Sequence, residues 1–179
     1  DMTTPEFLPE PVGGGYGDND EYRCFLFDPG LDADQWLTGY EVYPGNEAIV
    51  HHVIGMPIDP DATAAQGKTN AEWIEELDGA DGRDGWPCYS SAGEYIRVDG
   101  EYVSWAPGQG VVQYPEGSGL EMKAGQLFAI QIHYNMAVVQ GETDSTTVRL
   151  QLEDSVERPG QMVLYLSLIH ISEPTRQPC

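Results

Sequence analysis

The chain has 179 residues, of which 40% are hydrophobic, so its length suits one large domain or two small ones around a packed core. It carries 30 Asp and Glu against 8 Lys and Arg, and its formal net charge is −22. A surface of that charge repels phosphate backbones and anionic lipid, which argues against a nucleic-acid partner or a membrane partner. No apolar run reaches the roughly 20 residues that cross a bilayer, and no signal peptide is visible at the first residues.

Residues 1–20 contain three prolines and a run of three glycines, which predicts an extended linker. One domain is then expected over residues 21–165. Within it, short apolar or alternating segments lie between turn residues and predict strands at 22–27, 36–43, 48–56, 95–98, 101–105, 126–135, 146–152 and 162–166. Asn70 is the expected N-cap of one short helix over 71–77. The pattern predicts an all-β fold, an antiparallel, jelly-roll-like β-sandwich with one short helix.

Two turn segments carry more specific expectations. Asp99-Gly100 joins two β-rich segments, which is typical of a β-hairpin. The loop at 78–85 (DGADGRDG) faintly resembles a calcium loop, but Ala80 and Gly82 occupy positions where a calcium site needs oxygen ligands. A solvated turn is therefore the preferred interpretation.

Three histidines lie inside strand-like apolar segments: His51, His52 and His133. A buried imidazole needs a hydrogen-bond partner or a metal ion, and satisfied core histidines are the simpler interpretation. An adjacent His-His pair is unusual in a buried strand because successive side chains face opposite sides, unless a bulge turns both rings to one centre. Gln131 and His133 share one face of a second strand. Three neutral imidazoles without a thiolate would suit copper or zinc.

Several segments together resemble the N-terminal domain of the copper type II, ascorbate-dependent monooxygenases, a family that includes peptidylglycine alpha-hydroxylating and dopamine beta-monooxygenases and has bacterial members. The resemblance covers about residues 20–165 and is carried by the segments IVHHV (49–53), FAIQIHY (128–134), YRCF (22–25) and WAPG (105–108). The VHH and QxHY motifs are specific as a pair in this order.

The resemblance implies that His51, His52 and His133 bind an electron-transfer copper, with Gln131 close behind these ligands. It implies ascorbate as the small-molecule reductant, an extracellular or periplasmic location, and hydroxylation of an organic substrate by O2 at a second copper in a following C-terminal domain. No HxH pair for that second site occurs after His133, so this chain is expected to be a fragment that is incomplete for catalysis.

The cysteines and the C-terminal tail complete the expectations. Cys24, Cys88 and Cys179 have no zinc-knuckle spacing, and a Cys24–Cys88 disulfide could form in an oxidising compartment. The family's domain carries more disulfides than two cysteines can supply. Residues 166–176 (LSLIHISEPTR) resemble a translated sequencing adapter, so residues 166–179 are expected to be a non-native tail, the alternative being a natural edge strand.

Two other functions remain open from the residues alone. Three histidines and a water also describe a hydrolytic zinc site, although no carboxylate adjoins either histidine motif in the sequence to act as a general base. The third candidate is a non-catalytic β-sandwich binding module with structural histidines. Metal analysis would distinguish the binding module from the metal sites, and redox activity would distinguish copper from zinc.

Overall fold

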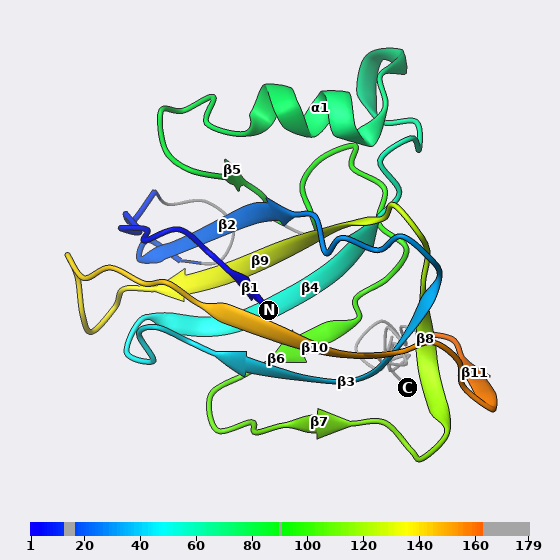
Figure 1. Ribbon diagram of the computed structural model, residues 1–179. Helices are drawn as coiled ribbons and strands as arrows, with labels where there is room; N and C mark the ends of the chain where they lie inside the picture. Colours follow the sequence, from blue (N-terminus) through cyan, green and yellow to red (C-terminus); the bar gives the residue numbers. More distant parts are fainter. Residues whose placement is uncertain (13–16, 90, 163–179) are drawn as a thin grey trace, which may run out of the picture.

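Two β-sheets pack face to face in the computed structural model, which describes residues 1–12, 17–89 and 91–162 (Figure 1). The first sheet has the strand order β1-β10-β3-β8-β11, with β7 also paired to β3. Its strands are β1 (Met2–Thr3), β10 (Thr147–Glu153), β3 (Gln35–Tyr43), β8 (Ser118–Met122), β11 (Arg158–Gly160) and β7 (Val112–Gln113). All its pairs are antiparallel except β8–β11, which is parallel.

The second sheet is antiparallel and has the order β5-β2-β9-β4-β6. Its strands are β5 (Trp86–Pro87), β2 (Asp20–Phe27), β9 (Leu127–Asn135), β4 (Val50–Ile58) and β6 (Val103–Trp105). The predicted all-β sandwich with a short helix is confirmed. In the described part of the chain, no helix is long and apolar enough to cross a membrane.

The main core fills the space between the sheets, and the alternation along β9 sets which side chains enter it. Phe128, Ile130, Ile132 and Tyr134 are fully buried in this core. Residues between them, such as Gln131 and His133, therefore point to the outer face of the second sheet, because successive strand side chains face opposite sides.

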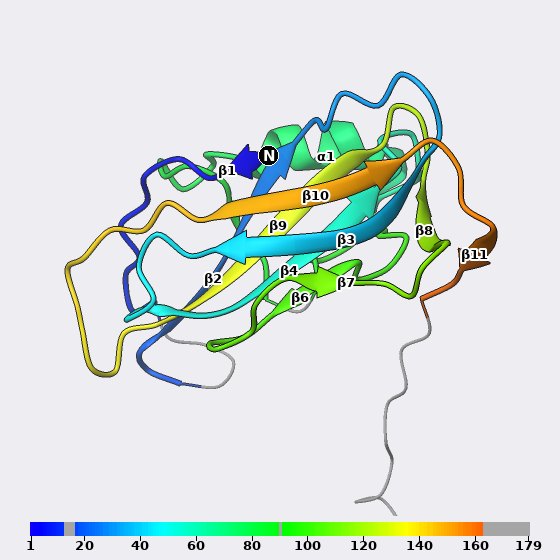
Figure 2. The same cartoon turned by 60° about the horizontal axis from the view of Figure 1, so that its bottom comes forward.

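A second, smaller core covers part of that outer face. Helix α1 (Asn70–Leu77) lies on the side of the second sheet that faces away from β3 and β10 (Figures 1 and 2). Ile74 of α1 packs there in one apolar cluster with Met56 of β4 and Ala129 of β9. The Cys24–Cys88 disulfide, which the sequence left open, is formed and belongs to the same cluster. The outer face of the second sheet is therefore only partly open to solvent.

The expected linker at residues 1–20 is contradicted at both of its ends. Met2 and Thr3 form β1 against β10, and Phe7 is buried between the rings of Phe25 and Tyr134. β2 begins at Asp20. The sequence did not predict these contacts, because they involve only isolated apolar residues in a Pro- and Gly-rich segment. The expected tail, 166–179, and almost all of the expected strand at 162–166 lie outside the described residues; β11 forms just before them.

The helix begins one residue earlier than predicted. Thr69 is the N-cap, and it forms a reciprocal capping box with Glu72. The side chain of Asn70 instead turns inward, where its amide bonds the carbonyl of Asp59 and both backbone groups of Arg97. Asn70 thus ties the helix to the segment that follows it.

The hairpin predicted around Asp99-Gly100 is not formed. Residues 95–98 are not a strand, and β6 pairs with β4 instead. Ile96 is buried in the smaller core beside α1, and Arg97 is held by Asn70. Burial against the helix therefore outweighs the local turn preference of the Asp-Gly pair.

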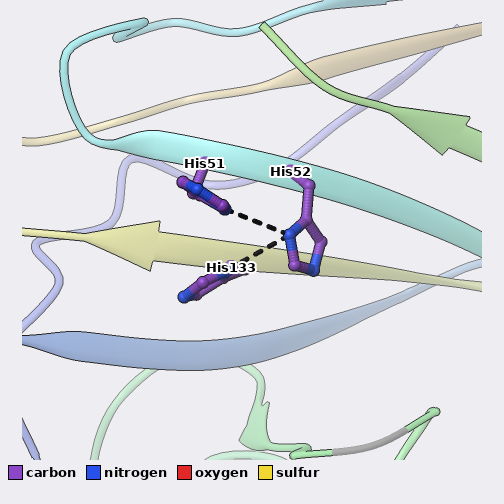
Figure 3. A group of neighbouring side chains, drawn as sticks. All are labelled: His51, His52 and His133. Carbon is purple, nitrogen blue, oxygen red and sulfur yellow. Dashed lines mark hydrogen bonds between the residues drawn. The ribbon is translucent and has the colours of Figure 1, made fainter. Parts of the chain in front are cut away.

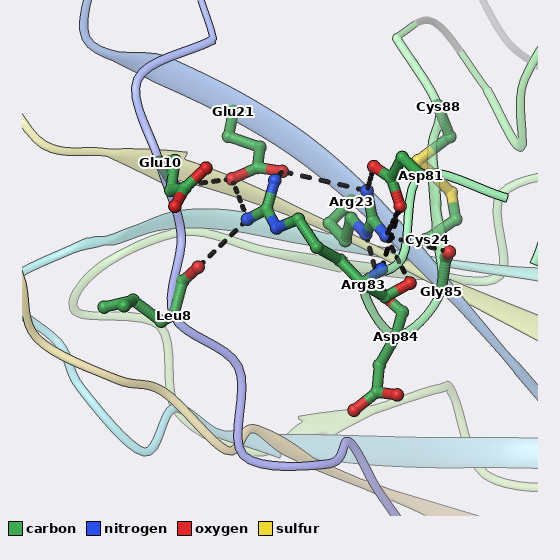
Figure 4. A network of polar contacts seen from close by, with 10 residues as sticks. All are labelled: Leu8, Glu10, Glu21, Arg23, Cys24, Asp81, Arg83, Asp84, Gly85 and Cys88. Atoms are coloured by element: carbon green, nitrogen blue, oxygen red, sulfur yellow. Dashed lines mark hydrogen bonds and ion pairs between the residues drawn. A yellow bond between two sulfur atoms is a disulfide. The ribbon is translucent and has the colours of Figure 1, made fainter. Parts of the chain in front are cut away.

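The loop at 78–85 wraps around a buried guanidinium of the chain itself (Figure 4). Arg23 of β2 is fully buried and donates two hydrogen bonds to the Asp81 carboxylate and further ones to the carbonyls of Arg83, Asp84 and Gly85. Arg83 in turn makes a bidentate ion pair with Glu21. Most of the loop is exposed, as predicted for a solvated turn, and it also holds β2 through these hydrogen bonds and ion pairs.

Candidate metal centre

Strands β4 and β9 bring the three predicted histidines together. His52 lies directly opposite His133 in the antiparallel pair, and the register shifts between Val50 and His52. This irregularity lets His51 and His52, although adjacent in sequence, turn to the same centre, because a bulge re-aims a strand side chain. The sequence-based condition for a shared site is thus met.

The ring nitrogens of the three histidines converge (Figure 3). His52 Nδ1 lies 3.3 Å from His51 Nδ1 and 3.2 Å from His133 Nδ1. One ligand atom from each ring lies within 4.8 Å of the other two. Zinc-to-imidazole bonds are 2.0–2.1 Å, so two ligand nitrogens in tetrahedral geometry are about 3.3 Å apart. The two distances to His52 therefore match the spacing of imidazoles bound to one metal ion, and the third ring nitrogen lies close by.

The chemistry of the donors supports the same interpretation. A neutral imidazole carries one proton on its two nitrogens, and each nitrogen without a proton presents a lone pair. Where three Nδ1 atoms meet, at most one proton can be shared between a given pair. A cation at this point would satisfy all three lone pairs at once, as a metal ion does when it binds neutral imidazoles.

Exposure decreases across the site from His51 to His133. The side chain of His51 is exposed, His52 is partly buried and His133 is buried with 6% exposure. Burial lowers the pKa of His52 to about 4, with smaller contributions from the other two rings. Burial also lowers the pKa of His133, although Asp20 opposes this shift. Both rings are therefore neutral near pH 7, the state that a metal ligand requires.

Two tyrosine rings pack beside the buried ring of His133. Tyr22 of β2 is opposite His133 in register, and the two rings stack at 4.1 Å between centroids and 5° between planes. Tyr89 meets Tyr22 edge-to-face at 5.1 Å. Tyr89 directly follows Cys88, whose disulfide to Cys24 fastens this loop to β2. The disulfide therefore helps to hold the ring stack in place.

Gln131 lies on the same face as His133 but serves the loop. Its amide donates to the backbone carbonyls of Cys88 and Ser91, and among the described residues none of its hydrogen bonds reaches an imidazole. The resemblance implied a place close behind the metal ligands. In the structure Gln131 binds the loop that carries Tyr89.

Sequence reasoning missed Asp20 and gave no role to Tyr22. Asp20 was assigned to the linker, yet it is buried at the start of β2, and its Oδ1 is 3.3 Å from His133 Nε2. The two-residue spacing of Asp20 and Tyr22 places both on the histidine face of the sheet, a signal that becomes readable once β2 is extended to residue 20.

Comparison with protein-family models and with curated proteins finds no match to this chain.

Proposed function

We propose that this chain is the copper-binding, electron-transfer half of an ascorbate-dependent copper monooxygenase, and that His51, His52 and His133 hold the copper. The observation that carries the proposal is the convergence of one ring nitrogen from each histidine, with the two distances to His52 Nδ1 at the spacing of metal ligands. The order of the two histidine motifs in the sequence supports the family, as described above.

Copper is favoured over zinc by the donor set. The site offers three imidazoles, and copper(II) binds a given nitrogen site more tightly than zinc does. No carboxylate belongs to the converging group, whereas a hydrolytic zinc site needs a base beside the metal-bound water. Asp20 lies at Nε2 of His133, the opposite edge of the ring from the convergence point. It is therefore poorly placed to act as that base.

A bound copper ion would accept and release single electrons at this position. The exposed ring of His51 gives a small reductant such as ascorbate access to the site, while the buried His133 fixes the far side. The disulfide supports an oxidising, extracellular-like environment, in agreement with an extracellular or periplasmic location. These residues would bind the ion and keep its ligands in one geometry during electron transfer.

Hydroxylation would need a second copper from another domain. In the part of the chain that the structure describes, the histidine cluster is the one group of three or more His, Cys, Asp or Glu side chains placed to hold a metal ion. We therefore assign to this chain the electron-transfer step alone, with the organic substrate and O2 handled by a partner copper domain.

Copper titration with electron spin resonance tests the proposal. Purified protein should bind one Cu(II) per chain, prefer it to Zn(II), and lose the Cu(II) signal on addition of ascorbate. His51→Ala, His52→Ala and His133→Ala should each weaken binding strongly, because two imidazoles replace three. Tight zinc uptake without copper binding would favour the hydrolytic alternative, and unchanged affinity in all three variants would refute the shared site.

A further inference from the structure

Asp20 is a buried carboxylate beside His133, at the buried end of the histidine site. It is 7% exposed, and its Oδ1 lies 3.3 Å from His133 Nε2. The same oxygen accepts a hydrogen bond of 2.6 Å from Asn135 Nδ2, across the β2–β9 pair. Asn135 thus fixes the position of the carboxylate oxygen that faces the imidazole.

His133 Nε2 is in an unusual state for a buried nitrogen. Among the described residues it is the one buried side-chain nitrogen or oxygen without an aligned hydrogen bond. The separation from Asp20 satisfies the distance of an ion pair, but the approach is not aligned as a hydrogen bond. A buried polar atom without a partner costs free energy, so this position calls for an acceptor.

The proton on His133 has only one suitable place when Nδ1 binds a metal ion. The metal takes the Nδ1 lone pair, so a neutral ring must carry its proton on Nε2. That proton then lies beside the Asp20 carboxylate. Metal-binding histidines commonly donate their second N–H to a carboxylate, which fixes the tautomer and makes the ring a stronger donor.

We propose that Asp20 is a positioning residue of the copper site, which accepts the Nε2 proton of His133 and thereby directs Nδ1 to the metal. This inference rests on the proposed function for the identity of the metal but not for the tautomer. The negative charge of Asp20 stabilises Cu(II) more than Cu(I), because the oxidised ion carries one more positive charge. Asp20 therefore also favours the oxidised state of the site.

Nitrogen-15 NMR of the metal-free protein tests the tautomer without copper. At pH 7.5, His133 of the unmodified protein should carry its proton on Nε2. In Asp20→Asn, the amide can no longer act as a charged acceptor, and the Nδ1-protonated form should increase. Asp18→Asn is the matched control, because Asp18 is exposed and the substitution removes the same charge two residues away. Protonation mainly at Nδ1 in the unmodified protein would overturn the inference.

Metal affinity provides the second measurement. Asp20→Asn should bind Cu(II) about 10- to 100-fold more weakly, as for other carboxylate–histidine–metal arrangements, while Asp18→Asn stays close to the unmodified protein. The loss should be smaller for Cu(I); a tenfold difference between the two losses equals a rise of 59 mV in reduction potential. Equal affinity and potential in both variants would refute the role of Asp20. If no variant binds copper, the proposed function fails, and the NMR result still decides the role of Asp20.

Discussion

Removal of the Cys24–Cys88 disulfide should destabilise the domain strongly. The bond closes a loop with a sequence separation of 64, which contains β3, β4 and α1. In the chain-entropy model, opening a loop of 64 residues lowers the free energy of unfolding by about 4 kcal/mol at 25 °C. For a domain of this size, each kcal/mol lowers Tm by about 2–4 °C, so a loss of about 10 °C is expected.

Urea unfolding of three proteins measures this effect. Cys179→Ala is the background in each, so that the third cysteine cannot exchange with the pair. The comparison uses the oxidised protein, the same protein reduced with a phosphine, and Cys24→Ala/Cys88→Ala. The reduced protein keeps both sulfur atoms in the core and isolates the effect of the cross-link. The double variant should be at least as unstable, because it also leaves a cavity in a fully buried cluster.

A small effect of reduction would contradict this account. If the reduced protein unfolds within about 1 kcal/mol of the oxidised one, the disulfide does not restrict the unfolded chain as the loop length requires. A large loss for the double variant alone would assign the stabilisation to packing of the sulfur atoms.

Three further predictions concern the site, the helix and the charge. The unfolding free energy of the metal-free protein should fall by roughly 2 kcal/mol between pH 6.5 and 4. The unfolded chain protonates His52 in this range, whereas the partly buried folded ring, with a pKa of about 4, stays mostly neutral until the lower end. His52→Gln should show a shallower fall in urea titrations, and equal slopes would contradict the assignment. Thr69→Ala should cost about 1 kcal/mol of stability through loss of the capping box, whereas Thr69→Ser should keep most of it; equal urea midpoints in all three proteins would contradict the cap. Reduction of bound Cu(II) by the ascorbate anion should become about three- to tenfold faster as salt rises from low concentration to roughly 0.5 M, because the net charge of −22 repels the anion. Stopped-flow rates with a cationic reductant should show the opposite trend. Rates that do not depend on salt would refute the repulsion.

The strands that carry the site could be predicted well from the sequence. Residues 126–135 alternate so clearly that the inward and outward faces of β9 follow from the letters alone, and the structure confirms them. The main core enforces this register, since a slip of one residue along β9 would place Gln131 and His133 inside that core.

Long-range contacts explain what the sequence did not reveal. The first residues pack through Met2 and Phe7, which are isolated among polar and proline residues and give no periodic signal. The Asp-Gly turn at 99–100 is a local preference that burial of Ile96 against α1 overrides. Local patterns determine local geometry, whereas the choice among competing partners depends on the whole fold.

The candidate site was likewise predictable in part: its ligands follow from local motifs, whereas its supporting residues depend on long-range contacts. The three ligands follow from residue type and motif, because adjacent histidines in an apolar strand need a special explanation. Asp20 could not be found in this way, since its role depends on β2 extending to the site and on Asn135 across the strand pair. Tyr22 belongs to the segment YRCF, but its stack on His133 is a cross-strand contact that only the register reveals.

X-ray absorption of the copper-loaded chain is the most direct test of the copper centre. We expect three imidazole nitrogens at about 2.0 Å from the copper, by analogy with other metal–imidazole bonds, and two in His133→Ala. The signal should keep its imidazole character after reduction by ascorbate. A sulfur ligand, or a spectrum with the same number of imidazoles in His133→Ala, would contradict a copper held jointly by His51, His52 and His133.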